Sequence, residues 1–208
     1  IADKVESMGV EIEYQATVTN IEFDGSDSTT TVVDKDGSEK KIEARFIIDA
    51  SGYGRVIPKL FNLNIPSTLP TRDTIFTQFK DVNRPEGHDS NRIVIVAHKP
   101  DVWIWIIPFS NGNTSFGFVG NPEYLKQYEG TTEEQLRALI ASEPKTKDRF
   151  AGAEMVFDPE YIAGYSIAVN RLYDEGYVLT GNSTEFLDPV FSAGVTFATE
   201  SGIAAGKL

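Results

Sequence analysis

The spacing of apolar residues changes several times along the first quarter of the chain. Residues 1–8 carry apolar side chains at helical spacing and Gly9 follows them, which predicts a short helix that ends there. The alternation from 10 to 14 then predicts a strand. Segments rich in β-branched residues, separated by Asp-Gly pairs, predict an antiparallel meander with strands over 17–23, 29–33 and 41–48. The last strand becomes continuously apolar at 46–48, as is typical of a strand buried on both faces.

A second set of strands follows a loop rich in proline and short polar residues. We place this loop at 58–70, with one helical turn in it, and a domain boundary near Arg55. Asn111-Gly112 is a strong hairpin signal between two of the later strands. The strands predicted in this part, which should form a mostly antiparallel sheet, are 74–79, 92–97, 102–107 and 114–119.

Helix and strand patterns alternate in the last third of the chain. Thr131-x-x-Glu134 is a capping box that begins a helix reaching Pro144. A short apolar strand is predicted at 177–180, and a helix entered through a loop at 192–206. The fold class is therefore mixed α/β. We expect an α/β lobe formed by 1–55 and 166–208, with an inserted lobe of antiparallel sheet plus helix at 56–165.

Composition and charge exclude several classes of function. The formal net charge of −12, with no basic stripe, argues against a nucleic-acid or anionic-membrane surface. The absence of cysteine removes disulfides, thiolate metal sites and a cysteine nucleophile, and it fits a reducing compartment, so we expect a cytoplasmic protein. His88 and His98 have no evident third ligand, and we expect no metal site.

Both ends of the sequence have the pattern of interrupted helices. The first residue is Ile1 rather than methionine, and the last ten residues have helical spacing without a cap. No segment has the pattern of a signal peptide or a membrane span. We therefore expect an internal piece of a longer protein.

One candidate site lies where the strand at 41–48 ends. Asp49-Ala50-Ser51-Gly52 follows it, and an acidic side chain at a strand end can accept a hydrogen bond from a sugar hydroxyl while glycine lets backbone approach a ligand. A plain strand followed by a tight turn explains the same residues equally well.

A second candidate site spans the loop before the last helix. Gly181, the pair Asp188-Pro189 and the run 192–194 form a backbone that could approach a flat ring, while free N–H groups at the helix start face an anion. A generic loop between strand and helix explains the glycines but not the whole string.

The only two tryptophans form a third candidate site. Trp103 and Trp105 are two residues apart on a predicted strand, so they share one face, and Pro108 closes the segment. From spacing alone, ordinary core packing is as good an interpretation as a binding surface.

Together these three stretches resemble the flavin-dependent halogenases and their relatives among the FAD monooxygenases and geranylgeranyl reductases. The resemblance covers nearly the whole chain, and the W-x-W-x-I-P motif is its most halogenase-specific part. It implies an FAD-binding lobe of the aromatic hydroxylase type, with the inserted sheet as the substrate lobe. The FAD contacts that it implies are Asp49, Ala50, Ser51, Gly52, Gly181, Asn182, Asp188, Pro189, Gly194 and Val195. It also implies a halide site at Ser192, Ala193 and Gly194, and residues near substrate and flavin at Trp103, Trp105, Pro108 and Phe191.

The sequence departs from that family at three points. Asn182 stands where the family has an aspartate, which replaces an anionic acceptor by a neutral amide. Phe191 replaces the acidic residue that tryptophan halogenases carry before their Ser-x-Gly segment, and this resembles members that act on phenols, pyrroles or carrier-bound aromatics. The family's G-x-G-x-x-G motif and catalytic lysine belong to a segment that precedes this one, so no lysine here is assigned that role.

The resemblance implies an FAD-dependent enzyme that uses reduced flavin, O2 and halide to halogenate an electron-rich aromatic substrate. The substrate is either free or tethered to a carrier protein, and a separate flavin reductase is the expected partner. An FAD monooxygenase or a geranylgeranyl-reductase-like dehydrogenase is the nearest enzyme alternative. From a different class, the isolated chain could be an inactive, flavin-poor binding module.

Overall fold

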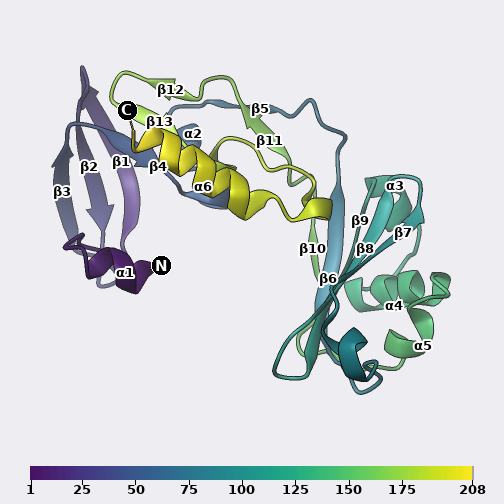
Figure 1. Ribbon diagram of the computed structural model, residues 1–208. Helices are drawn as coiled ribbons and strands as arrows, with labels where there is room; N and C mark the ends of the chain where they lie inside the picture. Colours follow the sequence, from purple (N-terminus) through teal and green to yellow (C-terminus); the bar gives the residue numbers. More distant parts are fainter. Residues whose placement is uncertain (208) are drawn as a thin grey trace. The chain divides into compact units, whose positions relative to one another are not determined.

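The computed structural model describes residues 1–207, which divide into two units (Figure 1). Unit 1 consists of Ile1–Ile65, Val169–Glu185 and the residues from Gly194 on, and unit 2 consists of Pro66–Ala168 and Phe186–Ala193. The first division lies later in the chain than the boundary expected near Arg55. The reason is that Ile57 is buried in the core of unit 1 and keeps the following residues with it.

Unit 1 combines an antiparallel meander with a small sheet that contains one parallel pair. The meander has the order β1-β2-β3, and the second sheet has the order β12-β13-β4. Its elements are α1 (Ala2–Glu6), β1 (Thr17–Asp24), β2 (Asp27–Val33), β3 (Glu39–Ala44), β4 (Ile47–Asp49), η1 (Gly52–Gly54), α2 (Val56–Leu60), β12 (Tyr173–Asp174), β13 (Tyr177–Leu179), η3 (Gly181–Ser183) and α6 (Gly194–Ala205). The core of this unit contains Ile21, Ile57, Leu63, Tyr177 and Leu179.

Two expectations for this part of the chain are wrong. Residues 10–14 form no strand, because no strand among residues 1–207 pairs with them, and a lone strand has no ladder to stabilise it. The strand expected at 41–48 is two strands: β3 pairs antiparallel with β2, and β4 pairs parallel with β13. β4 lies at the edge of its sheet, so Ile48 is 46% exposed instead of buried on both faces.

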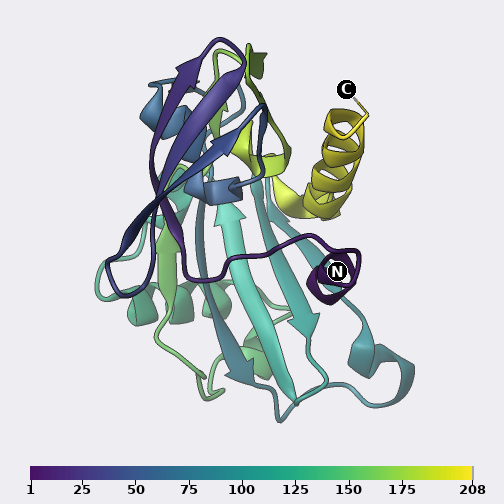
Figure 2. The ribbon, with the colours of Figure 1, turned by 90° about the vertical axis from the view of Figure 1, so that its left-hand side faces the viewer.

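Unit 2 is built on a five-stranded antiparallel sheet of order β10-β6-β9-β8-β7. Helices α3, α4 and α5 cover one face of this sheet, and Figure 2 views the sheet from the opposite side. The elements are β6 (Asp73–Lys80), η2 (Gly87–Asn91), β7 (Val94–Lys99), β8 (Val102–Pro108), β9 (Asn113–Gly120), α3 (Pro122–Leu125), α4 (Thr132–Ser142), α5 (Lys147–Phe150), β10 (Glu160–Ile162) and η4 (Pro189–Phe191). Two short strands, β5 (Asn64–Pro66) and β11 (Ile167–Val169), straddle the divisions between the units.

Local signals in the sequence account for most of unit 2. All four predicted strands are present, and Gly112, with a φ of 91°, turns the chain between β8 and β9 as expected. The capping box at α4 is complete, with Thr131 accepting from the Glu134 backbone and the Glu134 side chain accepting from the Thr131 backbone. The fold is mixed α/β, as predicted.

No helix within residues 1–207 has the length and apolar character needed to cross a bilayer.

Candidate functional site

The ends of β4 and β13 bring the turn after Asp49 next to the turn with Gly181 and Asn182, while Asp188, Pro189 and Ser192 of the second candidate site belong to unit 2. The strands are parallel, and Leu179 is paired with Asp49, so the turns that follow both strands lie at the same edge of the sheet. The Thr180 backbone N–H donates to the Asp49 carbonyl at 2.9 Å, and the Ser183 hydroxyl donates to the same carbonyl at 2.8 Å. This edge is the end of a parallel pair at which ligands bind in α/β sheets.

The Asp49 side chain is used within unit 1. Its Oδ1 accepts from the Ser51 backbone at 2.8 Å, and its Oδ2 accepts from the Ile57 backbone at 2.8 Å. The residue is 5% exposed. The carboxylate therefore shapes the turn and satisfies an N–H at the start of α2, while direct contact of Asp49 with a cofactor stays a prediction.

Gly181 is required by the approach of α6. Its φ is 54°, and a Cβ there would lie 3.1 Å from the Ala198 Cβ. Its N–H donates to the Ser201 hydroxyl at 3.0 Å. The sequence suggested that this glycine lets the backbone meet a ligand, whereas within unit 1 it lets the backbone meet a helix. The neighbouring Asn182 side chain makes no hydrogen bond with residues 1–207 and is available to a ligand.

Arg55 belongs to this region, although its sequence neighbourhood indicated only a domain boundary. It has left-handed backbone angles, φ 47° and ψ 52°, and it is 6% exposed. Its guanidinium donates to the Asn64 side chain at 2.6 and 2.9 Å, and to the carbonyls of Asn182 and Thr184 at 3.4 and 3.3 Å. Burial lowers the pKa of Arg55 by more than the charges of Asp49 and Glu185 raise it, so the pKa lies below its ordinary value. Arg55 therefore clamps the turn that contains Asn182.

The two tryptophans lie side by side on the face of the unit 2 sheet opposite the helices. This surface, centred on Trp103 and Trp105 and called the tryptophan face below, also includes Phe76 from β6. The indole centroids are 6.0 Å apart, and the Phe76 ring is 5.9 Å from Trp105. All three side chains are half-buried, whereas their strand neighbour Ile104 on the other face is fully buried.

Trp105 is held by the sheet itself. Its Nε1–H donates to the Ser115 hydroxyl on the adjacent strand at 2.9 Å. Its ring lies across Gly117, where a Cβ would be 2.4 Å from two ring atoms. Only glycine leaves room for this ring position.

The Trp103 side chain is held by Asp188, a residue outside the strands of the sheet. Its Nε1–H donates to Asp188 Oδ1 at 3.0 Å, and the Arg72 Nε is 3.5 Å from Asp188 Oδ2. Arg72 also donates to Asp101 at 3.0 Å. These contacts join the predicted Asp-Pro motif to the tryptophan motif within unit 2, a link that no local sequence pattern indicates.

The segment after Asp188 leads in one short turn to the predicted halide residues. Pro189–Phe191 forms η4, and the Ser192 N–H donates to the Pro189 carbonyl at 2.8 Å. Ser192 has a φ of 54°, which reverses the chain before α6 begins at Gly194. Neither Ala193 nor Gly194 donates its N–H to another of residues 1–207. Phe191 is 90% exposed, and Pro108 ends β8.

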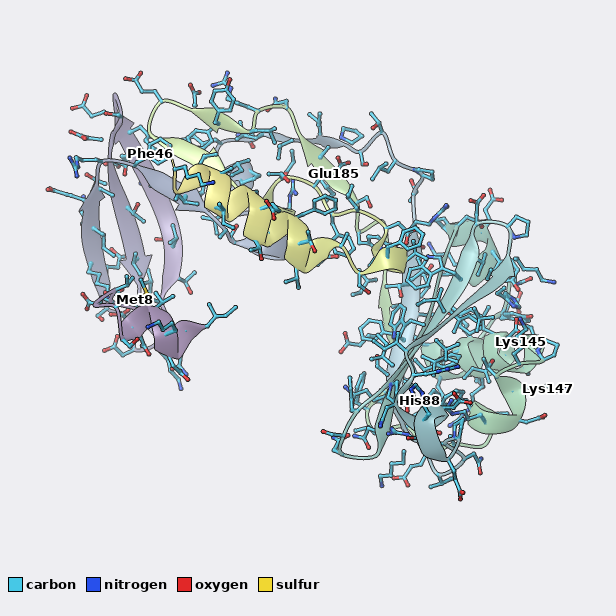
Figure 3. All side chains as sticks on the ribbon, viewed as in Figure 1. Met8, Phe46, His88, Lys145, Lys147 and Glu185 are labelled. Atoms are coloured by element: carbon cyan, nitrogen blue, oxygen red, sulfur yellow. The ribbon has the colours of Figure 1, made fainter. Side chains whose placement is uncertain are left out.

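The two histidines of unit 2, and its lysines Lys145 and Lys147, lie outside the strand that carries Trp103 and Trp105. His88 is on η2, while Lys145 and Lys147 lie beyond the C-terminal end of α4, on the helix side of the sheet (Figure 3). His98 is buried between Glu143, at 2.6 Å from Nδ1, and Tyr124, at 2.5 Å from Nε2. No group of three or more metal-ligating side chains is present among residues 1–207.

The partners of Glu143 lower the pKa of its carboxyl although it is buried. Burial raises its pKa, but hydrogen bonds from His98 and from the Lys145 backbone, with the charges of both residues, lower the pKa further than burial raises it. Tyr124, His98 and Glu143 thus join α3, β7 and the end of α4 through side chains on the covered face. We interpret them as a structural network.

Comparison with known proteins gives a consistent result. The family model described as tryptophan halogenase matches residues 1–206. The 1H-pyrrole-2-carbonyl-(peptidyl-carrier protein) brominase of Pseudoalteromonas luteoviolacea is 27% identical over 207 residues, covering 93% of this chain and 49% of that protein.

Solved structures of flavoproteins are also similar to the chain. A flavoprotein/dehydrogenase from Cytophaga hutchinsonii is 57% identical with a TM-score of 0.93, covering 100% of this chain and 51% of that one. The flavin-dependent brominase Bmp2 is 26% identical with a TM-score of 0.85, covering 98% of this chain and 51% of that one. The chain spans about half the length of the curated relatives it matches.

Proposed function

The chain belongs to the tryptophan halogenase family, and from this premise we propose that the whole protein is an FAD-dependent halogenase. It transfers an oxidised halide to an electron-rich aromatic ring. The observation that carries this proposal is the pairing of Trp103 and Trp105 on the face of the unit 2 sheet opposite its helices. The bond from Trp103 to Asp188 ties that face to the turn leading to Ser192.

The residues of the chain fit FAD at two places. In unit 1, the turns after β4 and β13 offer Ala50, the Ser51-Gly52 backbone and the free Asn182 amide, which can bond hydroxyl groups of the cofactor. Around the start of α6, Gly194 has open space where a Cβ would stand, so backbone can approach a flat ring. Val195 follows it and is 79% exposed.

Halide would be held by the turn before α6. The N–H groups of Ala193 and Gly194 have no acceptor among residues 1–207, and Ser192 adds a hydroxyl. N–H groups at the first turn of a helix favour an anion. When bound, reduced FAD together with O2 would supply the two-electron oxidation of the halide. The overall reaction consumes the aromatic C–H, halide, one proton, O2 and reduced FAD. It yields the C–halogen product, FAD and two waters.

The tryptophan face provides a flat aromatic surface for the substrate. Trp103, Trp105 and Phe76 can pack against a planar ring, and Phe191 lies exposed on η4. Indole rings also exclude water, which limits hydrolysis of a reactive oxidant. The catalytic lysine implied by the family is expected outside these residues, and none of the lysines here is assigned the role.

The relatives suggest the partners. The Pseudoalteromonas brominase is named for a pyrrole tethered to a peptidyl-carrier protein. We propose a small aromatic substrate for this protein, free or carrier-tethered, and a separate reductase that supplies reduced FAD. We place the protein in the cytoplasm because a cysteine-free chain suits a reducing compartment.

A second candidate is an FAD-dependent dehydrogenase or monooxygenase on the same fold. The observation that favours it is the 57% identity to the protein described as a flavoprotein/dehydrogenase. Fold alone does not separate these reactions.

The mass of the product separates the candidates. The whole protein, with whatever its gene encodes on either side of these residues, is incubated with reduced FAD, O2, bromide and a panel of phenols, pyrroles and indoles. We expect a bromine isotope doublet that disappears when bromide is omitted. The gain of one oxygen, or of hydrogen without halide dependence, would assign the protein to the second candidate.

FAD titration tests the alternative from a different class, a flavin-poor binding module. Binding is followed by quenching of flavin fluorescence, first with the whole protein and then with this chain alone. Micromolar affinity of the whole protein supports the enzyme. Micromolar binding by this chain alone counts against the module, whereas no binding by this chain supports the module for the isolated chain.

A further inference from the structure

Asp188 belongs to a motif that the family resemblance assigns to FAD, yet its carboxylate is engaged within unit 2. One oxygen accepts from the Trp103 indole at 3.0 Å, and the other lies 3.5 Å from the Arg72 Nε. The Arg72 side chain is 14% exposed, and the Asp188 side chain is 34% exposed. The carboxylate is thus held on two sides, by a hydrogen bond from Trp103 and by an ion pair with the largely buried Arg72.

The two tryptophans differ in how their orientation is fixed. The Trp105 indole bonds to Ser115 on the adjacent strand, and its ring fits over Gly117, so the sheet alone holds it. The Trp103 indole bonds to a residue 85 positions away in the sequence. Its N–H orientation therefore depends on where the segment 186–193 lies.

The same bond fixes the segment. Asp188 is directly followed by Pro189, whose ring restricts the backbone, and the Ser192 N–H closes the turn on the Pro189 carbonyl at 2.8 Å. Few backbone rotations remain free between the Asp188 carboxylate and Ser192. Placing the carboxylate against Trp103 therefore also places Ser192 relative to the tryptophan face.

From this geometry we propose that Asp188 is a positioning residue: it aligns Trp103 with the turn that carries Ser192, and it does not bind the flavin itself. The effect of Asp188 on catalysis rests on the proposed function. The alignment of Trp103 with the Ser192 turn does not. Arg72 is the second member of the arrangement, because it holds the carboxylate oxygen that Trp103 does not use.

The structural part is tested in the whole protein by nitrogen-15 NMR of the indole N–H groups, two of which come from Trp103 and Trp105. Trp103→Phe and Trp105→Phe assign the two signals. In Asp188→Ala we expect the Trp103 signal to move and the Trp105 signal to stay, because only Trp103 loses a charged acceptor. Ser115→Ala is the matched control and should move only the Trp105 signal. An unmoved Trp103 signal in Asp188→Ala overturns the proposal.

The catalytic part is tested in the whole protein by a double-mutant cycle. Asp188→Ala and Trp103→Phe should each reduce kcat/KM for halogenation by about tenfold or more, and the double variant should be no worse than the single ones, because both remove one interaction. Asp188→Asn, which keeps an oxygen for the indole, should recover part of the loss. The dissociation constant of FAD should change less than about threefold in all of them.

The alternative outcome has a distinct signature. If Asp188 binds the flavin, Asp188→Ala weakens FAD binding strongly, Trp103→Phe does not, and the two losses add. That result overturns the positioning role. If the wild type forms no halogenated product, the proposed function fails, while the indole signals and the FAD affinities still decide the role of Asp188.

Discussion

The two faces of the unit 2 sheet hold their aromatic side chains in different ways. On the helix-covered face, Phe79, Phe116 and Phe118 are 0% exposed and pack against α4 and α5 residues without polar contacts of their own. On the tryptophan face, Trp103 and Trp105 are half-buried, and each donates one hydrogen bond. Burial stabilises the first face, whereas directional contacts fix the second. The difference indicates that one face maintains the fold, and our proposal assigns the other face to a ligand.

Phe116→Ala should have the largest effect on stability. The ring is fully buried, and its centroid lies 4.7 Å from the centroid of the Phe150 ring. Its loss therefore leaves a cavity in the core. We expect a decrease of about 3–5 kcal/mol in the free energy of unfolding, measured by chemical denaturation. Ile95→Ala is the control on the opposite face: Ile95 is 41% exposed, and its loss should cost much less. Equal losses would contradict the assignment of the two faces.

Asp81→Asn should come next and should depend on pH. Burial raises the pKa of Asp81, but hydrogen bonds from Arg149 and Thr114, with the charges of Arg149 and Arg84, hold the pKa below its ordinary value. Breaking this buried pair should cost about 3 kcal/mol at neutral pH. A carboxylate with a lowered folded pKa contributes stability that is fully present above its unfolded pKa of about 4 and is lost as the pH falls through the folded pKa.

The difference in unfolding free energy between the wild type and Asp81→Asn should therefore shrink below about pH 4. Urea denaturation at a series of pH values measures it. Asp148→Asn, on the exposed side of α5, is the control and should show little difference at any pH. A difference that stays constant from neutral to acid pH would mean that the charge of Asp81 is not what stabilises this network.

Gly117→Ala tests whether the tryptophan face also tolerates little change. The added Cβ would stand 2.4 Å from the Trp105 ring and 2.7 Å from the Phe76 Cβ, so the indole must move. We expect a loss of about 1–3 kcal/mol and a change in tryptophan fluorescence. Gly152→Ala, where a Cβ meets nothing within 4 Å, is the matched control. Unchanged fluorescence in Gly117→Ala would show that Trp105 does not lie across this glycine.

Thr131→Ala should have the smallest effect of the four. It removes the hydroxyl that accepts from the Glu134 backbone at 3.3 Å at the start of α4. A loss of about 1 kcal/mol is expected in thermal or chemical unfolding, because the cap is exposed. Thr132→Ala, one residue further into the helix and outside the capping box, should change stability by less than about 0.5 kcal/mol. Equal effects of the two changes would refute the role of the cap.

Local patterns were sufficient to predict most elements of unit 2. The β8–β9 hairpin follows from Asn111-Gly112, and α4 follows from Thr131 and Glu134, because each signal acts over a few residues. The strand expected at 10–14 failed for the opposite reason. Alternation describes a side-chain pattern, but a strand also needs a partner, and none is present for it within residues 1–207.

The contacts that join the residues of the candidate site could not be predicted from local sequence patterns. Trp103 and Asp188 were both predicted as site residues, but their hydrogen bond spans 85 positions, and neither sequence neighbourhood specifies it. Arg55 gave no signal either, since its left-handed backbone and its bonds to the Asn182 turn come from tertiary packing. The parallel pairing of β4 with β13 belongs to the same class of long-range contact.

The most direct test of the account is the ratio of brominated to oxygenated product made by the Trp103→Phe variant of the whole protein. Phenylalanine keeps an aromatic ring on the tryptophan face but removes the N–H that binds Asp188. If this face takes part in the reaction, the brominated fraction falls relative to the wild type while the free energy of unfolding changes by about 1 kcal/mol or less. An unchanged brominated fraction with unchanged kcat/KM would contradict the claim that the tryptophan face serves the chemistry.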